Sequence, residues 1–191
     1  ASLTAFGNTV PTSFLRLVPH QEAPTAICWG DRNRSVLVRV PLGWQNIDDS
    51  MFRDANPAEP AIDELPNDSQ TVELRSPDGS AAVHLLLAGI AVAARIGLTE
   101  PGMADYARER KVDGDASQTP DLDQLPGSCF EAAGRLLTQR EDYEAKGVFP
   151  AGLIDSWASR LVALGDMHLR DDLADSRISV EELVERYFHI G

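Results

Sequence analysis

The pattern of the chain changes near residue 80, and this change limits the folds that the chain can adopt. Residues 1–80 hold most of the prolines and have the signals of strands and loops, whereas residues 81–191 carry the signals of successive helices. We therefore predict an α+β fold in which helices pack on an antiparallel sheet and form nearly all of the C-terminal half. The 191 residues, 43% of them apolar, are enough to bury a core as a single piece.

Helix boundaries in the second part are marked by capping residues and by glycine or proline. Two Ser-x-x-Glu sequences, at Ser128 and at Ser179, have the spacing of capping boxes, in which side chain and backbone bond each other reciprocally. The predicted helices are 81–97, capped by Ser80; 99–110, opened by Thr99 and Pro101; 128–147; 150–165, between Pro150 and Gly165; and a C-terminal helix from Ser179.

Two segments of the first part have the composition of strands. Residues 35–42 are β-branched and include Pro41 near their end, and residues 70–76 alternate Glu73 and Arg75 with apolar neighbours. The residues between the two segments are polar and rich in Pro, Asn and Asp, so we predict a long excursion there.

The charge of the chain excludes several classes of partner. Thirty acidic residues against 17 basic ones give a net charge of −13, which argues against binding to nucleic acid or to anionic membranes. The longest apolar run, near 85–94, is too short to span a bilayer. Two cysteines far apart, without a disulfide framework or a signal peptide, favour a reducing cytoplasm. A local group of arginines in such a chain indicates a small, dense anion.

Three arginines lie within eight positions of the stretch "CWGDRNRSVLVRV", residues 28–40. Arg34 and Arg39 are five residues apart and would face opposite sides of a regular strand. They can share one ligand only if Arg34 belongs to the preceding turn or if a bulge intervenes. Arg39 stands between valines and needs a partner, whereas Arg32 is equally well explained as a surface residue.

Three further charged residues are candidates for a site. Glu73 and Arg75 project to one face of their strand, where they either pair with each other or place a ligand for a divalent cation beside an arginine that holds an oxyanion. Glu22, with Arg16 upstream, lies in a proline-bounded loop, and its restrained carboxylate suits a gating or proton-accepting role.

The order of several motifs resembles the catalytic domain of the glutamine synthetase family. They are "NTVPTSFLRLVPHQEAP", "CWGDRNRSVLVRVP", "VELRSPDGSAAVHLLLAGIAVAARIGL", "LPGSCFEAAGRLL", "GVFPAGLID" and "VEELVERYFHIG". The resemblance covers essentially all of residues 1–191 and corresponds to the C-terminal part of such an enzyme. It implies that an N-terminal β-domain and further catalytic residues lie upstream, and that the fragment alone is inactive. It also implies a homo-oligomeric ring in which a neighbouring subunit completes each site.

For the amino-acid side of the site, the resemblance implies three roles. Arg16 is similar to the arginine that holds the carboxylate of substrate glutamate. Glu22 is similar to the glutamate that closes the site and accepts a proton from ammonium. Arg75 is similar to the arginine that contacts glutamate and its acyl phosphate.

For the phosphate side, the resemblance implies ATP as co-substrate and Mg²⁺ or Mn²⁺ as cofactor. Arg34 and Arg39 are similar to the arginines that face the nucleotide phosphates and the transferred phosphoryl group. Glu73 is similar to a ligand of the metal that coordinates the γ-phosphate. The implied reaction joins glutamate and ammonia through a γ-glutamyl phosphate intermediate.

Departures from the family pattern leave two alternatives open. Thr71 replaces a frequent arginine, which removes support for a nucleotide contact there, and His84 falls in a replaced motif, where we expect a packed helix residue. A ligase that joins glutamate to another amine would share the glutamate and phosphate contacts. A non-catalytic homologue with a structural role is the second alternative, and the retained charged residues argue against it.

Overall fold

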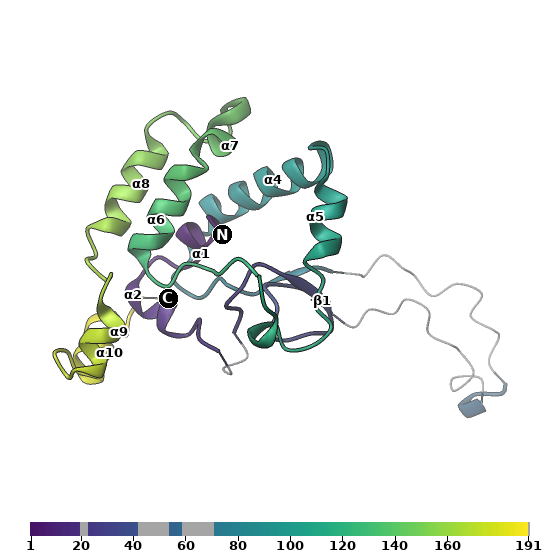
Figure 1. The fold of residues 1–191 in the computed structure, drawn as a ribbon, viewed down its shortest axis with the longest axis horizontal. Helices are drawn as coiled ribbons and strands as arrows, with labels where there is room; N and C mark the ends of the chain where they lie inside the picture. The colour runs from purple at the N-terminus through teal and green to yellow at the C-terminus, as the bar shows by residue number, and fades with distance from the viewer. Residues whose placement is uncertain (20–22, 42–53, 59–70, 191) are drawn as a thin grey trace.

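The computed structural model describes residues 1–19, 23–41, 54–58 and 71–190. Figure 1 shows a group of helices on one side of the molecule and a small sheet near β1 on the other. Glu22 and most of the predicted excursion lie outside the described residues. The helices are α1 (Thr4–Gly7), α2 (Pro11–Leu15), α4 (Val83–Thr99), α5 (Met103–Glu109), η2 (Ala116–Gln118), α6 (Cys129–Thr138), α7 (Arg140–Glu144), η3 (Ala145–Gly147), α8 (Leu153–Val162), α9 (Leu169–Ala174) and α10 (Val180–Tyr187).

The sheet has three short strands in the order β1-β2-β3, namely β1 (Trp29–Asp31), β2 (Val38–Val40) and β3 (Glu73–Leu74). The antiparallel prediction is correct for β2 and β3, but it is wrong for β1 and β2, which are parallel. The mixed sheet still gives the α+β class that we predicted.

A turn at Arg32 and Asn33 connects the two parallel strands. Arg32 adopts a left-handed conformation with φ of 55°, and its N–H donates to the carbonyl of Val40 at 2.8 Å. The Asn33 side chain then accepts the N–H of Ser35 at 2.9 Å, which turns the chain back toward β2. This local bonding is why the predicted strand over 35–42 shortens to Val38–Val40.

The C-terminal capping box is confirmed, and the one at Ser128 forms only in part. Ser179 accepts the N–H of Glu182 at 3.1 Å, and the Glu182 carboxylate accepts the N–H of Ser179 at 2.7 Å. Ser128 caps α6, but the Glu131 carboxylate accepts the N–H of Gly127 instead. The predicted helix 128–147 also breaks, because α6 ends at Thr138 and α7 follows.

The prediction for Ser80 is wrong. Its hydroxyl donates to Asp78 at 2.7 Å and accepts the N–H of Thr9 at 2.9 Å, so it anchors a turn, and α4 begins later and continues to Thr99. The helices predicted from Thr99 and Pro150 begin instead after Gly102 and Gly152, whose φ values of 81° and 82° favour glycine.

No single helix in the described ranges is long and apolar enough to cross a membrane.

The main core joins α1 to the helices of the second part. Phe6 is fully buried and stacks on Phe149, with ring centroids 5.4 Å apart, while Tyr143 packs edge-on against both rings. The indole N–H of Trp157 donates to the carbonyl of Ala5 at 2.7 Å. Residues at the two ends of the described chain therefore fold around one core, and α6 and α8 pack side by side beside it (Figure 1).

A second, smaller core lies under β1. Trp29 donates its N–H to Arg110 at 3.0 Å and accepts the N–H of Val112 at 2.8 Å, so the segment after α5 pairs with the outer edge of β1. A Cβ placed on Gly30 would lie 2.4 Å from the carbonyl oxygen of Val112. This close approach of two backbones requires glycine in the strand.

We expect Gly30→Ala to lower the free energy of unfolding by about 1–3 kcal/mol, because the added methyl group would push β1 away from Val112. Urea denaturation measures the loss. Gly114→Ala is the matched control, since nothing lies within 4 Å of a Cβ added at Gly114. Equal stabilities of the two variants would contradict the close approach.

Candidate active site

The side chains of Arg39, Glu73 and Arg75 meet on one face of the sheet. Arg39 and Glu73 are register partners across β2 and β3, so their side chains project to the same side. Arg39 Nη2 lies 2.6 Å from Glu73 Oε2, and Arg75 Nε lies 3.6 Å from Glu73 Oε1. The Glu73 carboxylate is therefore held between two guanidinium groups.

The sequence left open whether Glu73 and Arg75 pair with each other, and the structure answers that part of the question. The two residues do pair, but the closer partner of Glu73 is Arg39, on the neighbouring strand. The expectation that Arg39 needs a partner is thereby confirmed. Among the described residues, Glu73 is the carboxylate in contact with both guanidinium groups, so an incoming anion would compete with Glu73 for them.

Arg16 approaches the same region from α2. Its Nη2 donates to the carbonyl of Ser76, directly after Arg75, and lies 3.3 Å from the carbonyl oxygen of Pro77. Arg16 remains exposed, so its guanidinium can also reach a ligand in solvent. Arg16 therefore bonds the backbone carbonyl directly after Arg75, the other arginine to which the resemblance gave a role in binding glutamate.

The turn after β3 is fixed by the N-terminal segment, which sequence reasoning missed. The side-chain amide of Asn8 donates to the carbonyl of Ser76 at 2.8 Å, and the N–H of Asp78 donates to Gly7 at 3.1 Å. Thr9 Oγ1 donates to the carbonyl of Ser80 at 2.6 Å. These bonds join residues about 70 positions apart, and no spacing in the sequence signals them.

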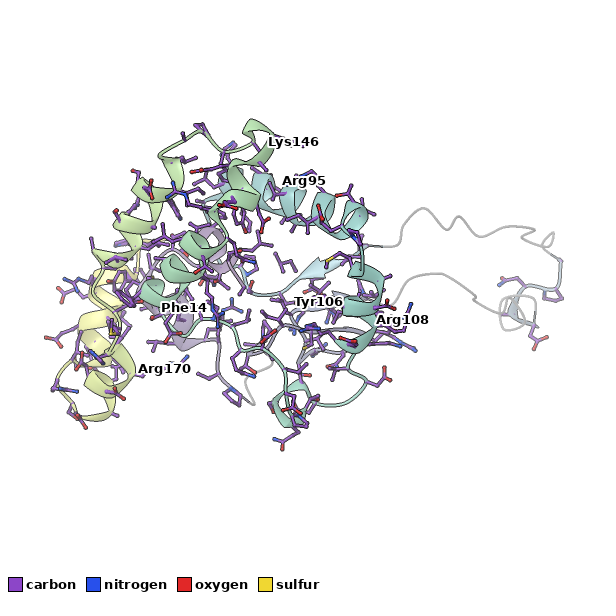
Figure 2. The ribbon with its side chains drawn as sticks, turned by 45° about the horizontal axis from the view of Figure 1, so that its top comes forward. Phe14, Arg95, Tyr106, Arg108, Lys146 and Arg170 are labelled. Carbon is purple, nitrogen blue, oxygen red and sulfur yellow. The ribbon has the colours of Figure 1, made fainter. Side chains whose placement is uncertain are left out.

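The segment that carries Arg16 is held from its other side by α9. Arg170 Nη2 donates to the carbonyl of Phe14 at 2.8 Å and lies 3.3 Å from that of Leu17. Figure 2 labels Arg170 and Phe14, which come from helices far apart in the sequence. The backbone on both sides of Arg16 is therefore bound to a distant helix.

Arg34 lies in the loop between β1 and β2 and not in β2, which is the position that the strand-parity argument named as one way for Arg34 to share a ligand with Arg39. With Arg32, Asn33 and Asp113 it lines a cavity of about 440 Å³, to which this loop, residues 113–117 and three residues between Pro19 and Thr25 contribute. Asn33 donates to the carbonyl of Gly114 at 2.6 Å, which joins the two sides. Arg39 contacts Glu73 on the sheet instead, so Arg34 and Arg39 occupy different surroundings.

The residues that the structure describes do not assemble a metal site by themselves. Nowhere in the described ranges do three His, Cys, Asp or Glu side chains gather to hold an ion. Glu73 is one carboxylate, already in contact with two guanidinium groups, whereas Mg²⁺ needs several oxygen ligands. Further ligands would have to come from outside the described residues.

The two cysteines do not supply a nucleophile. Both thiols are unpaired and buried. Burial raises the pKa of the Cys28 thiol, and burial together with the nearby Asp166 carboxylate raises the pKa of Cys129. Both thiols stay protonated near neutral pH, so thiolate chemistry is not available to this site.

Comparisons with known proteins place the chain beside one family of enzymes. A family model described as glutamine synthetase, catalytic domain, matches residues 1–160. The chain is 34% identical to a glutamine synthetase of Pyrococcus abyssi and 31% identical to one of Thermococcus kodakarensis, each over 99% of this chain and 39% of the relative. A glutamine synthetase of Mycobacterium tuberculosis is 30% identical over 83% of the chain. The chain thus spans about two fifths of the length of these archaeal relatives.

We expect Glu73→Gln to make the sheet face bind inorganic phosphate about fivefold more tightly. The exchange removes the carboxylate that competes for Arg39 and Arg75, and solvent screening of a partly exposed group limits the gain to about 1 kcal/mol. Calorimetric titration with phosphate measures the change. Glu109→Gln, which removes an exposed carboxylate beside Arg110, is the control. Equal phosphate affinity of the two variants would contradict the competition.

Proposed function

Since the chain belongs to the glutamine synthetase family, we propose that it forms the glutamate- and phosphate-binding part of an ATP-dependent glutamate–ammonia ligase. The γ-carboxylate of glutamate attacks the terminal phosphate of ATP, which gives γ-glutamyl phosphate and ADP. Ammonia then attacks the carbonyl carbon of the acyl phosphate, phosphate leaves, and loss of a proton gives glutamine. The observation that carries the proposal is the meeting of Arg39 and Arg75 on one face, with Arg16 at the adjoining turn.

Phosphoryl transfer needs positioning and charge neutralisation more than covalent help from the protein. Arg39 and Arg75 provide two positive groups beside each other, at a place where the developing charge on the phosphoryl oxygens can be held. In this proposal the transferred group takes the place of the Glu73 carboxylate at Arg39. Arg34, which lies on a separate loop, binds the nucleotide phosphates.

Glutamate binding is assigned to Arg16 and Arg75. Arg16 bonds the backbone carbonyl of the residue after Arg75, so the two arginines come from adjoining segments, which suits an amino acid with two carboxylates. Glu22 keeps the role that the resemblance implies, as the residue that accepts a proton from ammonium. Its place in the chain, in the loop after Arg16, supports a position beside the glutamate site.

A divalent cation, Mg²⁺ or Mn²⁺, is part of the proposal because the family generally uses one. Glu73 would be one of its ligands, and the others would come from outside the described residues. When bound, such an ion supplies positive charge to the phosphate oxygens. Glu73 itself would then exchange its contact with Arg39 for the metal.

The complete activity is proposed for the full-length protein, because the chain spans 39% of its first relatives. We propose that the full-length protein is a homo-oligomer acting in the cytoplasm, and that residues 1–191 alone show no turnover. Ligation of glutamate to another amine uses the same arginines, so a panel of amines distinguishes that activity from glutamine synthesis. A non-catalytic homologue would release no phosphate with any of them.

Phosphate release by the full-length protein, dependent on glutamate, ammonia, ATP and Mg²⁺, tests the proposal. We expect Arg39→Ala and Arg75→Ala to lower kcat about 100-fold or more, because each removes a group that stabilises the transferred phosphoryl oxygens. Glu22→Ala should lower the ammonia-dependent rate.

Arg108→Ala is the matched control, since Arg108 is an exposed residue of α5 that pairs with Asp105 (Figure 2). We expect this variant to retain wild-type turnover. Unchanged turnover of both Arg39→Ala and Arg75→Ala would refute the site assignment, and absence of phosphate release with every amine would refute the enzyme.

A further inference from the structure

The carbonyl group of Ser76 lies between the two arginines assigned to glutamate. Ser76 directly follows Arg75, and its carbonyl oxygen accepts a hydrogen bond from Arg16 Nη2. The same oxygen accepts a second bond, from Asn8 Nδ2, at 2.8 Å. A carbonyl oxygen has two lone pairs, so these two donors saturate it.

Asn8 is fully buried, at 0% exposure, and follows the end of α1. It cannot touch a substrate in solvent, so any influence on the reaction must pass through the group that it binds. The amide nitrogen, and not the amide oxygen, faces Ser76, because a carbonyl oxygen repels another oxygen without a hydrogen between them. The bond therefore requires the amide and cannot be made by a carboxylate.

The backbone at Arg75 is consequently held on both sides. The N–H of Arg75 donates to the carbonyl of Leu37 at 2.9 Å, which ties the residue to the segment before β2. On its carboxyl side, Asn8 holds the carbonyl of Ser76. The long Arg75 side chain thus starts from a backbone whose position is set by the sheet and by α1 together.

We propose that Asn8 is a positioning residue which, through the carbonyl of Ser76, sets the distance between Arg75 and Arg16 for binding of glutamate. This inference rests on the proposed function. Small errors in the placement of binding groups are costly, since a displacement of about 1 Å can reduce a rate about 100-fold. Without Asn8, only the exposed Arg16 holds Ser76, and Arg16 must then bind both the carbonyl and the substrate.

The affinity for ATP should not change when Asn8 is replaced. Arg34 stands on the loop after β1, which is fixed by bonds of its own from Asn33 and Ser35 to residues 112–116. A positioning role for Asn8 therefore predicts a selective effect on glutamate, whereas a purely structural role would disturb both ligands through loss of folded protein.

The test uses Asn8→Ala and the isosteric Asn8→Asp in the full-length protein, with Tyr143→Phe as control. Tyr143 makes a comparable buried hydrogen bond, to Ser2 at 2.6 Å, in the helical core. We expect kcat/KM for glutamate to fall about tenfold in both Asn8 variants, with the dissociation constant of ATP unchanged. Tyr143→Phe should lower the unfolding midpoint and leave kcat/KM for glutamate at the wild-type value. An equal kcat/KM for glutamate in Asn8→Ala and Tyr143→Phe would overturn the inference.

Hydrogen–deuterium exchange separates this inference from the proposed function. Loss of the bond should speed exchange at the amides of Arg75 and Asp78 in Asn8→Ala but not in Tyr143→Phe. If the wild-type protein releases no phosphate, only the proposed function fails, and faster exchange still supports the positioning of Arg75 by Asn8. Unchanged exchange overturns it. If Asn8→Asp does not fold because it buries a charge, the comparison with Tyr143→Phe is made with Asn8→Ala alone.

Discussion

The hydrogen bonds between residues 7–16 and the turn at 76–80 are the contacts on which the rest of the site depends. They place the end of β3 against α1 and α2, although about 70 residues separate the two segments along the chain. Buried polar groups are costly to leave unbonded, so the bond from Asn8 Nδ2 to the carbonyl of Ser76 favours the one packing of these two segments in which it can form. Because α1 also carries Phe6 into the helical core, the same segment connects that core to the sheet.

The charges follow a pattern that suits an anion in an acidic protein. A net charge of −13 discourages polyanions in general, while on the sheet face Arg39 and Arg75 both contact the carboxylate of Glu73. That carboxylate neutralises part of the positive charge in the structure described here, so binding of phosphate or glutamate requires an exchange of partners at the arginines. Catalysis in this family of ligases would then draw on groups that are already assembled before the substrates arrive.

Much of the candidate site could be predicted because its residues lie close together along the chain. The alternation of Glu73 and Arg75 predicted that both project to one face, and the strand-parity argument named the turn before β2 as one of two ways for Arg34 to share a ligand with Arg39. The bond from Arg39 to Glu73 could not be predicted from either strand alone, since it depends on which residue of β2 lies opposite β3. Asp166 shows the same limit, because its carboxylate accepts the N–H groups of Cys129 and Phe130 from a distant loop.

The sequence by itself determined the features that act over a few residues: the α+β division, the existence of five helices after residue 80, the Ser179 capping box and the need of Arg39 for a partner. Tertiary structure decided the parallel pairing of β1, the role of Ser80 as an anchor instead of a cap, and the joining of Arg16 to Arg75 through Ser76. The physical reason is the distance along the chain over which each interaction acts. Propensity and capping depend on neighbours within one helical turn, whereas a buried carbonyl takes whichever donor the packing of distant segments brings to it.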